Sequence, residues 1–141
     1  MVETDVHPGF MTDWQQPLIV ALTQAEGVSI VHETVYENRL GFTSALNQMG
    51  ADIVVHPEGL AGAYRRVARR PLEQAAVITG PTPLQGADIV VPDLRGGYAY
   101  VIAALAAKGT SRVSNVGIIR RGYEKFFDKL TALGADFDVV G

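Results

Sequence analysis

Apolar and polar residues follow two different periods along this chain, and each change of period marks an element. Apolar side chains three and four positions apart predict helices, whereas short runs rich in β-branched residues predict strands. The pattern predicts the order β-α-β-α-β twice. In the first copy the ranges are strand 2–6, helix 13–26, strand 28–35, helix 40–49 and strand 51–55. In the second they are strand 87–91, helix 96–109, strand 111–119, helix 123–133 and strand 135–140.

The two predicted helices of the first copy each have an apolar face. We expect the apolar face of the first helix to contain Leu18, Leu22 and Ala25. We expect the apolar face of the second helix to contain Phe42, Leu46 and Met49. The residues between the copies, 64–84, are interpreted as an extra hairpin and linker, punctuated by prolines.

One phrase ends both copies, LNQMGADIVV at 46–55 and LTALGADFDVV at 130–140. Gly50 and Gly134 follow the predicted helices, where glycine readily adopts the left-handed conformation that ends a helix. A shift of 82 residues also aligns TQAEGVSIVHETV with LAAKGTSRVSNVG, and the two GAD phrases lie 84 residues apart. The sequence therefore predicts two copies of one building block, the second with two extra residues near its second helix.

The repeat places charged residues at matching positions. Asp13 aligns with Arg95, and Arg39 aligns with Arg121. All four follow predicted strands or open predicted helices, where free backbone N–H groups and the helix dipole favour anions. Three arginines at such positions indicate guanidinium groups that converge on an anionic ligand. Surface ion pairing is the alternative.

Asp13 has two interpretations. Thr12 and Gln15 have the S/T-x-x-E/Q spacing of a capping box, which alone would account for an acidic residue in the first turn of a helix. The functional alternative is a carboxylate that acts as a general base on a substrate hydroxyl.

The stretch PDLRGG also has two interpretations. Asp93 and Arg95 close a predicted strand and open a helix through Gly96 and Gly97. Glycines there would let a ligand approach the backbone, and an arginine suits phosphate or carboxylate. The alternative is an aspartate helix cap beside a solvated arginine.

Composition narrows the function classes. The 141 residues are 48% apolar and 19% charged, which is typical of a globular protein. The net charge of −3 provides no electrostatic field that would attract nucleic acid or anionic membranes. No apolar run spans a bilayer, the N-terminus lacks a signal-peptide pattern, and there are no cysteines. We therefore expect a cytoplasmic protein. RRVARR at 65–70 is interpreted as a solvated hairpin face, and the three histidines lack the spacing of metal ligands.

Several of these motifs together resemble one family. TDWQQ, TVYENR, PDLRGG, RRGYEKFFDKLTALGA and the repeated GAD are similar, in order and spacing, to the C-terminal part of the UDP-N-acetylglucosamine 1-carboxyvinyltransferases, the enolpyruvyl transferases of peptidoglycan synthesis. The resemblance covers nearly the whole chain except 57–75, interpreted as a hairpin insertion.

The resemblance implies an α+β fold, an inverse α/β barrel of tandem βαβαβ(β) units with mixed sheets and helices packed inside. Residues 1–84 would form one βαβαββ unit and 85–141 a second, incomplete unit of one domain in a larger two-domain enzyme. That enzyme would transfer the enolpyruvyl group of phosphoenolpyruvate to the 3′-hydroxyl of UDP-N-acetylglucosamine through a tetrahedral intermediate, the first committed step of peptidoglycan synthesis. It implies no metal or cofactor.

The resemblance also implies roles for single residues. Asp13 would take the 3′-hydroxyl proton, and Val35 would contact the sugar nucleotide through its backbone. The arginines Arg39, Arg95 and Arg121 would hold phosphoenolpyruvate and stabilise charge in the transition state, with Arg121 counted as catalytic. Asp93 would help to position the reacting groups.

The chain also departs from the family pattern. Arg120 stands where the family often has an aspartate before RGY, and the family's general-acid loop and N-terminal lysine lie in regions that this chain does not contain. We therefore expect the chain alone to be inactive, to need the N-terminal part of the enzyme as its partner, and to self-associate through the apolar face left open. The alternatives are a substrate-shifted paralogue and a non-catalytic binding or scaffold module.

Overall fold

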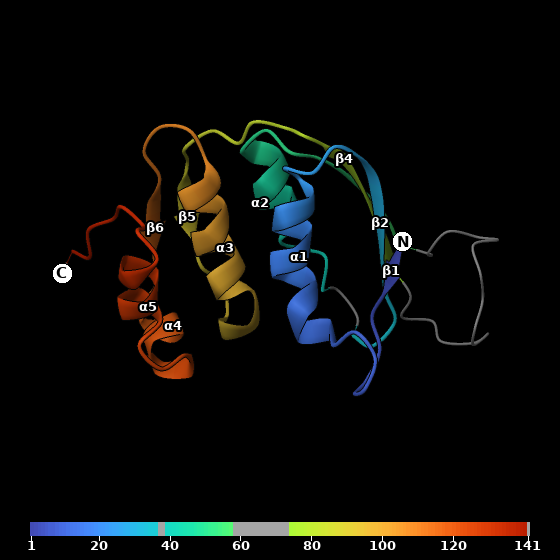
Figure 1. The fold of residues 1–141 in the computed structure, drawn as a ribbon, viewed down its shortest axis with the longest axis horizontal. Helices are drawn as coiled ribbons and strands as arrows, with labels where there is room; N and C mark the ends of the chain where they lie inside the picture. Colours follow the sequence, from blue (N-terminus) through green and yellow to red (C-terminus); the bar gives the residue numbers. More distant parts are fainter. Residues whose placement is uncertain (37–38, 58–73, 141) are drawn as a thin grey trace.

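The computed structural model describes residues 1–36, 39–57 and 74–140, and its largest feature is a four-stranded mixed sheet (Figure 1). The strand order is β1 (Val2–Glu3), β2 (Gly27–Glu33), β4 (Gln74–Gly80) and β3 (Asp52–His56). β1 runs parallel to β2, whereas β4 is antiparallel to both β2 and β3.

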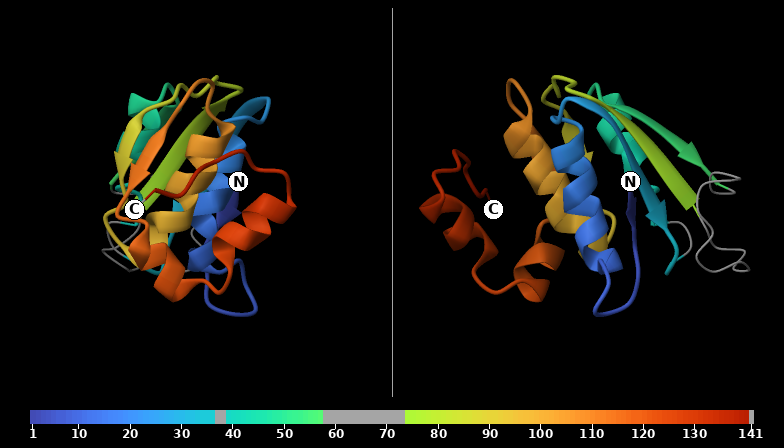
Figure 2. Two further views of the ribbon diagram at one scale, coloured as in Figure 1. Left: turned by 90° about the vertical axis from the view of Figure 1, so that its left-hand side faces the viewer. Right: turned by 45° about the vertical axis from the view of Figure 1, so that its right-hand side comes forward.

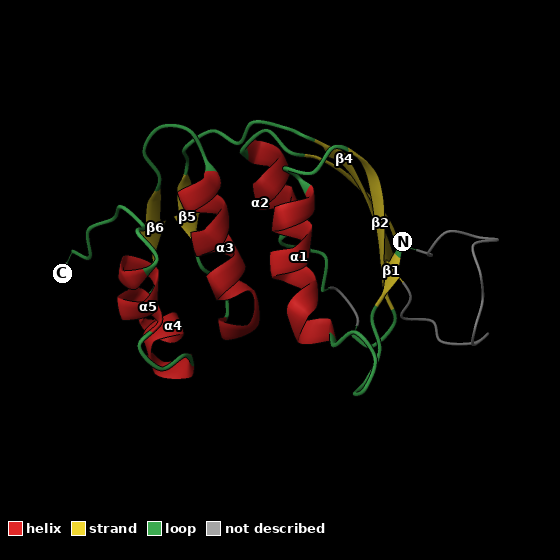
Figure 3. Ribbon diagram, viewed as in Figure 1, coloured by secondary structure: helices red, strands yellow, loops and turns green. Residues whose placement is uncertain are grey.

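Helices cover one face of this sheet, and no described helix covers the other. The 3₁₀ helix η1 (Thr12–Trp14) leads into α1 (Gln15–Leu22), which contacts β2 and β4, and α2 (Thr43–Gln48) contacts β3 (Figure 3). Strand residues that face the helices are almost fully buried: Val31, Ile53, Ala76 and Ile78. Their neighbours on the other face, such as Val28 and Val54, are exposed, as expected for a sheet with one covered face.

The second half of the chain begins with a strand-helix-strand unit. β5 (Asp88–Val90) and β6 (Arg112–Ser114) form a parallel pair joined through α3 (Leu94–Ala106). α3 packs beside α1, so the two long helices lie in the middle of the molecule, with α4 (Gly117–Gly122) and α5 (Phe126–Ala132) beyond α3 (Figure 2). The predicted α+β class with mixed sheets and helices packed inside is confirmed.

The glycines that end the helices are confirmed as left-handed in both copies. Among the residues that the structure describes, the glycines with positive φ are two repeat-matched pairs: Gly27 (103°) with Gly109 (85°), and Gly50 (109°) with Gly134 (89°). In the second pair, the residue after each glycine donates its amide N–H to the carbonyl five residues earlier, which is the hydrogen bond of a Schellman turn. These bonds are Ala51 N to Leu46 O (3.0 Å) and Ala135 N to Leu130 O (3.1 Å).

The first copy differs from its predicted boundaries at its start. β1 is shorter than 2–6, and the first helix is η1 followed by α1, which ends at Leu22 and not at 26. The fully buried residues of α1 are Ile19 and Val20, while Leu18 and Leu22 are only partly buried. The predicted face was therefore wrong by one position, because α1 is covered by α3 as well as by the sheet. In α2 the predicted apolar residues Phe42, Leu46 and Met49 are buried.

The second copy contains two larger errors. The strand predicted at 111–119 ends at Ser114, because Asn115 is left-handed (φ 62°) and α4 begins two residues later. The strand predicted at 135–140 is not formed. An extended segment becomes a strand only when another strand pairs with its backbone, and none does so among the described residues.

The stretch interpreted as hairpin and linker contains β4, which lies in the centre of the sheet between β2 and β3. Residues 58–73 lie outside the described residues, and with them RRVARR and most of the predicted insertion at 57–75.

Candidate active site

Glu33, the last residue of β2, is a fully buried carboxylate that accepts four hydrogen bonds. Strand alternation places it on the covered face with Val31. Its Oε2 accepts from Thr12 Oγ1 and Gln15 Nε2, both at 2.9 Å. Its Oε1 accepts from the backbone N–H groups of Val35 (2.9 Å) and Tyr36 (3.0 Å). Glu33 was not predicted as a site residue, although a glutamate at an inward-facing strand position was a visible signal.

The capping-box interpretation of Thr12 and Gln15 is wrong. The residue before η1 is Met11, and no side chain caps either η1 or α1. Both polar side chains turn instead toward Glu33, whose Oε2 accepts their hydrogen bonds inside the core. Their spacing brings them to one partner because Thr12 begins η1 and Gln15 begins α1, which follows η1 directly.

Asp13 and Arg39 form an ion pair with one buried and one open member. Arg39 Nη1 and Nη2 both donate to Asp13 Oδ1 at 3.1 Å, and Nη1 also donates to Thr12 Oγ1 at 2.9 Å. The side chain of Arg39 is 6% exposed and that of Asp13 is 72% exposed. The Arg39 guanidinium also lies over the ring of Tyr36, 4.7 Å from its centroid. The result is an accessible carboxylate held by a fixed cation.

The direction of these hydrogen bonds follows from the donors. A guanidinium can only donate, so Thr12 Oγ1 accepts from Arg39 and gives its own proton to Glu33. All four partners of Glu33 are donors, so both of its carboxyl oxygens act as acceptors. Arg39 therefore donates in two directions: to Thr12, which donates in turn to the buried Glu33, and to Asp13 on the surface.

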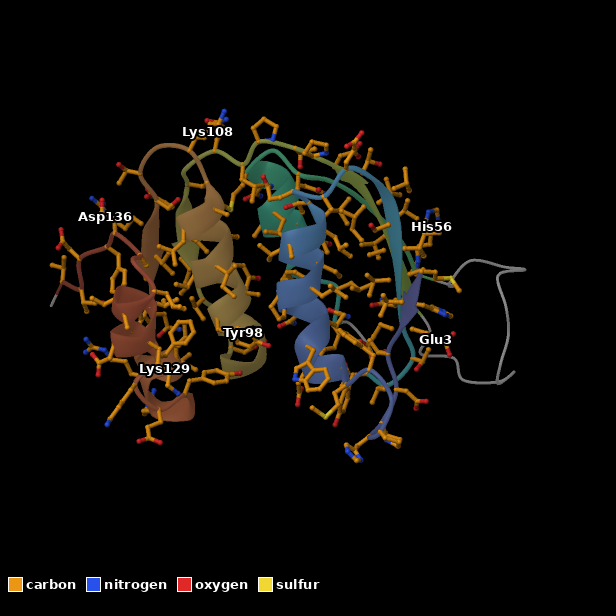
Figure 4. The ribbon with its side chains drawn as sticks, viewed as in Figure 1. Glu3, His56, Tyr98, Lys108, Lys129 and Asp136 are labelled. Carbon is orange, nitrogen blue, oxygen red and sulfur yellow. The ribbon has the colours of Figure 1, made fainter. Side chains whose placement is uncertain are left out.

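Tyr98 connects this site to the second copy. It lies near the start of α3, on the side toward α1 (Figure 4), and its hydroxyl donates to the backbone carbonyl of Asp13 at 2.5 Å. Its ring meets that of Tyr123 edge to face at 5.1 Å. Burial, and then the nearby Tyr123 and Asp13, raise the pKa of Tyr98 to about 12. The phenol therefore stays protonated and remains a donor at neutral pH.

Arg121 is not joined to the Asp13–Arg39 pair by any contact among the described residues. It is exposed in the last turn of α4, and its Nε donates to the carbonyl of Gly117 at 3.3 Å within the same helix. Two residues later, the ring of Tyr123 contacts Tyr98 and so connects this segment to the pair. The side chain of Arg95 lies outside the described residues.

The PDLRGG stretch forms the helix cap that was one of its two interpretations. Asp93 is the N-cap of α3, and its Oδ1 accepts from Gly96 N at 2.9 Å. Both glycines are buried. A Cβ on Gly96 would meet Gln16 Oε1 at 3.3 Å, and a Cβ on Gly97 would meet the side chain of Ile119 at 3.0 Å. Helix packing therefore accounts for the two glycines without a ligand at the backbone.

Arg120 has a packing partner in the structure. Arg120, which stands where the family often has an aspartate before RGY, lies over the ring of Phe127 in α5, 5.7 Å from its centroid.

Within the part of the chain that the structure describes, no three acidic or histidine side chains gather as metal ligands. None of the described helices has the length and apolar character of a membrane span.

Comparison with known proteins identifies relatives of the chain. It is 55% identical over 139 residues to the UDP-N-acetylglucosamine 1-carboxyvinyltransferase of Protochlamydia amoebophila, covering 99% of this chain and 30% of that protein. It is 52% identical over 136 residues to the protein of that name in Chlamydia muridarum, covering 96% and 31%. The chain thus spans about a third of the length of these relatives.

Two solved structures have a similar fold. The enolpyruvyl transferase NikO from Streptomyces tendae matches with a TM-score of 0.74 and 29% identity, over 96% of this chain and 28% of that one. The EPSP synthase from Acinetobacter baumannii matches with a TM-score of 0.62 and 18% identity, over 92% and 27%, which shows the fold alone.

A family model also matches this sequence. The model described as EPSP synthase (3-phosphoshikimate 1-carboxyvinyltransferase) covers residues 1–130. That range is most of the 141-residue chain. The chain therefore belongs to the EPSP synthase family.

Proposed function

We propose that this chain is the C-terminal part of an enzyme that transfers the enolpyruvyl group of phosphoenolpyruvate to the 3′-hydroxyl of UDP-N-acetylglucosamine. The relatives at 55% and 52% identity are UDP-N-acetylglucosamine 1-carboxyvinyltransferases, which supports this reaction. The chain spans only 30% and 31% of their length, which supports the proposal that it is part of a larger protein. We expect the enzyme to act in the cytoplasm at the first committed step of peptidoglycan synthesis.

The observation that carries the proposal is the Asp13–Arg39 pair. Asp13 presents an exposed carboxylate, and two hydrogen bonds from a buried guanidinium fix its position. A general base must reach the proton that it removes and must stay oriented while it does so. In the proposed reaction Asp13 accepts the 3′-hydroxyl proton, the sugar oxygen bonds to C2 of phosphoenolpyruvate, and C3 takes a proton from the general acid, which gives the tetrahedral intermediate. Loss of phosphate from C2 and of one proton from C3 restores the double bond and completes the transfer.

Arg39 has a more specific role in this proposal than direct binding of phosphoenolpyruvate. Its Nη atoms are bound to Thr12 and Asp13, so it orients the base and supplies positive charge beside the anionic substrate. Arg95 and Arg121 remain the proposed ligands of the phosphate and carboxylate. The general acid is supplied by the part of the enzyme outside this chain.

Val35 fits a contact with the sugar nucleotide through its backbone. Its N–H is held by Glu33 Oε1 at 2.9 Å, so a ligand contact here would use the carbonyl oxygen. Asp93 holds the start of α3, and this cap supports the proposal that it positions the segment carrying Arg95.

Phosphate release by the longer enzyme that contains this chain tests the proposal. We expect release that requires both phosphoenolpyruvate and UDP-N-acetylglucosamine, little release with 3-phosphoshikimate as acceptor, and none from the isolated 141-residue chain. Release with 3-phosphoshikimate alone would assign a different acceptor. The absence of release with either acceptor would contradict the proposed function.

A further inference from the structure

We propose that Glu33 is a positioning residue of the active site, which holds the Asp13–Arg39 pair through one oxygen and the backbone at Val35 through the other. This inference rests on the proposed function. Glu33 itself is completely buried and cannot touch a substrate. It would act through the groups that it holds.

The two oxygens of Glu33 serve two different segments. Oε2 binds Thr12 and Gln15 at the start of the helix that carries Asp13, and Thr12 in turn accepts from Arg39. Oε1 binds the N–H groups of Val35 and Tyr36, which follow the strand. One carboxylate therefore sets the distance between the proposed base and the proposed sugar-nucleotide contact.

The framework itself does not require an acid at this position. In the second copy the matching residue is Asn115, which is exposed and donates its amide to the carbonyl of Val91 at 2.8 Å. A buried charge costs free energy unless it is fully hydrogen-bonded. The buried acid in the first copy thus occurs where the site residues are, and not at the matching position of the repeat.

The two branches predict separable kinetic effects. Loss of the Oε2 branch should misplace Asp13 and lower kcat, because small displacements of a catalytic group reduce rates strongly. Loss of the Oε1 branch should release the turn at Val35 and raise KM for the sugar nucleotide. A role confined to stability would change neither parameter in the folded enzyme.

Thr12→Val in the longer enzyme cuts the Oε2 branch at its link to Arg39, leaves the bond from Gln15 and nearly preserves shape. We expect kcat to fall about tenfold, with KM for UDP-N-acetylglucosamine within about twofold of the wild type. Thr12→Ser keeps the hydroxyl and should restore kcat to within about twofold. Thr23→Val is the matched control, since Thr23 is a buried threonine at the other end of α1 whose hydroxyl bonds the carbonyl of Val20. It should lose stability and keep its kcat.

Glu33→Gln tests both branches together, because an amide has one acceptor oxygen where the carboxylate has two. We expect a fall in kcat at least as large as that of Thr12→Val, together with a raised KM for the sugar nucleotide. A kcat in Thr12→Val and Glu33→Gln equal to that of Thr23→Val would overturn the proposal while leaving the proposed function intact.

A crystal structure of Thr12→Val separates the positioning role from the reaction itself. We expect the Asp13–Arg39 pair to be displaced relative to the wild-type protein. If the pair did not move, the positioning role of Glu33 would be overturned, whatever the activity of the wild-type enzyme. Absence of phosphate release by the wild-type enzyme would instead contradict the proposed function.

Discussion

The two copies of the repeat share a turn but differ in the segment after it. Gly50 and Gly134 are both left-handed, and the next residue makes the same hydrogen bond in each copy. The first copy then continues into β3, which pairs with β4, whereas residues 135–140 have no strand partner among the described residues. The comparison shows that local sequence determines the turn, while a strand also requires a neighbour.

The charged residues of the copies differ in the same way. Asp13 and Arg39 meet in the first copy, and Glu33 connects the segments that carry them. In the second copy Arg121 is exposed and bonds only within its helix as far as the described contacts go. The first copy therefore holds an assembled polar network, and the described side chains at the matching positions of the second copy form none.

The largest expected difference between the copies concerns the buried acid. Glu33→Leu leaves four buried donors without their acceptor and should lower the free energy of unfolding by about 4 kcal/mol. Asn115→Ala, at the matching position, should cost about 1 kcal/mol. Urea denaturation followed by circular dichroism measures both. Equal losses would contradict the claim that the polar network around Glu33 contributes more to stability than the single described bond of Asn115.

A second comparison concerns the residue that follows each GAD phrase. Ile53 is 5% exposed in a paired strand, and Ile53→Ala should cost about 3 kcal/mol. Phe137 is half-buried in an unpaired segment, and Phe137→Ala should cost about 1 kcal/mol. The same denaturation series tests this pair, and a larger loss for Phe137→Ala would show that 135–140 is packed as firmly as β3.

The glycine turns allow a finer test. Gly50→Ala places a Cβ at 3.1 Å from the carbonyl oxygen of Pro83 as well as at positive φ, so it should cost about 2 kcal/mol. Gly134→Ala meets nothing within 4 Å and should cost about 1 kcal/mol for its backbone conformation alone. If the two alanines destabilised the protein equally, the close contact at Gly50 would have no energetic effect.

The smallest expected effect is on the link between the copies. The pKa of Tyr98 is raised from 10.0 to about 12, so folding favours its protonated form. Its contribution to stability should be complete below about pH 10 and lost as the pH rises to about 12. An ultraviolet titration of the phenols should show a late transition that Tyr98→Phe removes. A titration in which this late step survives the substitution would assign it to another tyrosine.

Parts of the fold were predictable because they depend on local sequence. Helix ends at Gly50 and Gly134 follow from the backbone freedom of glycine, and the buried face of α2 follows from apolar spacing. The central place of β4 was not predictable, since periodicity does not determine strand order. The turn at Asn115 was missed because asparagine adopts positive φ only in some contexts.

The candidate site was predictable as a set of residue types but not as an arrangement. The repeat pointed to Asp13 and Arg39, and the structure joins them. The network around them depends on a sheet that brings η1 beside the end of β2, so neither the role of Thr12 nor that of Glu33 followed from spacing. A capping box and a bond to a distant acid require the same residue types, and only the fold distinguishes them.

The role of Asp13 as the base is tested most directly by the rate of phosphate release from the longer enzyme carrying Asp13→Asn, which removes the carboxylate but keeps its shape. Asp128→Asn, an exposed acid in α5, is the matched control. We predict a fall of at least about a hundredfold for Asp13→Asn, with unfolding unchanged, and a rate within about twofold of the wild type for the control. A wild-type rate in Asp13→Asn would contradict this role.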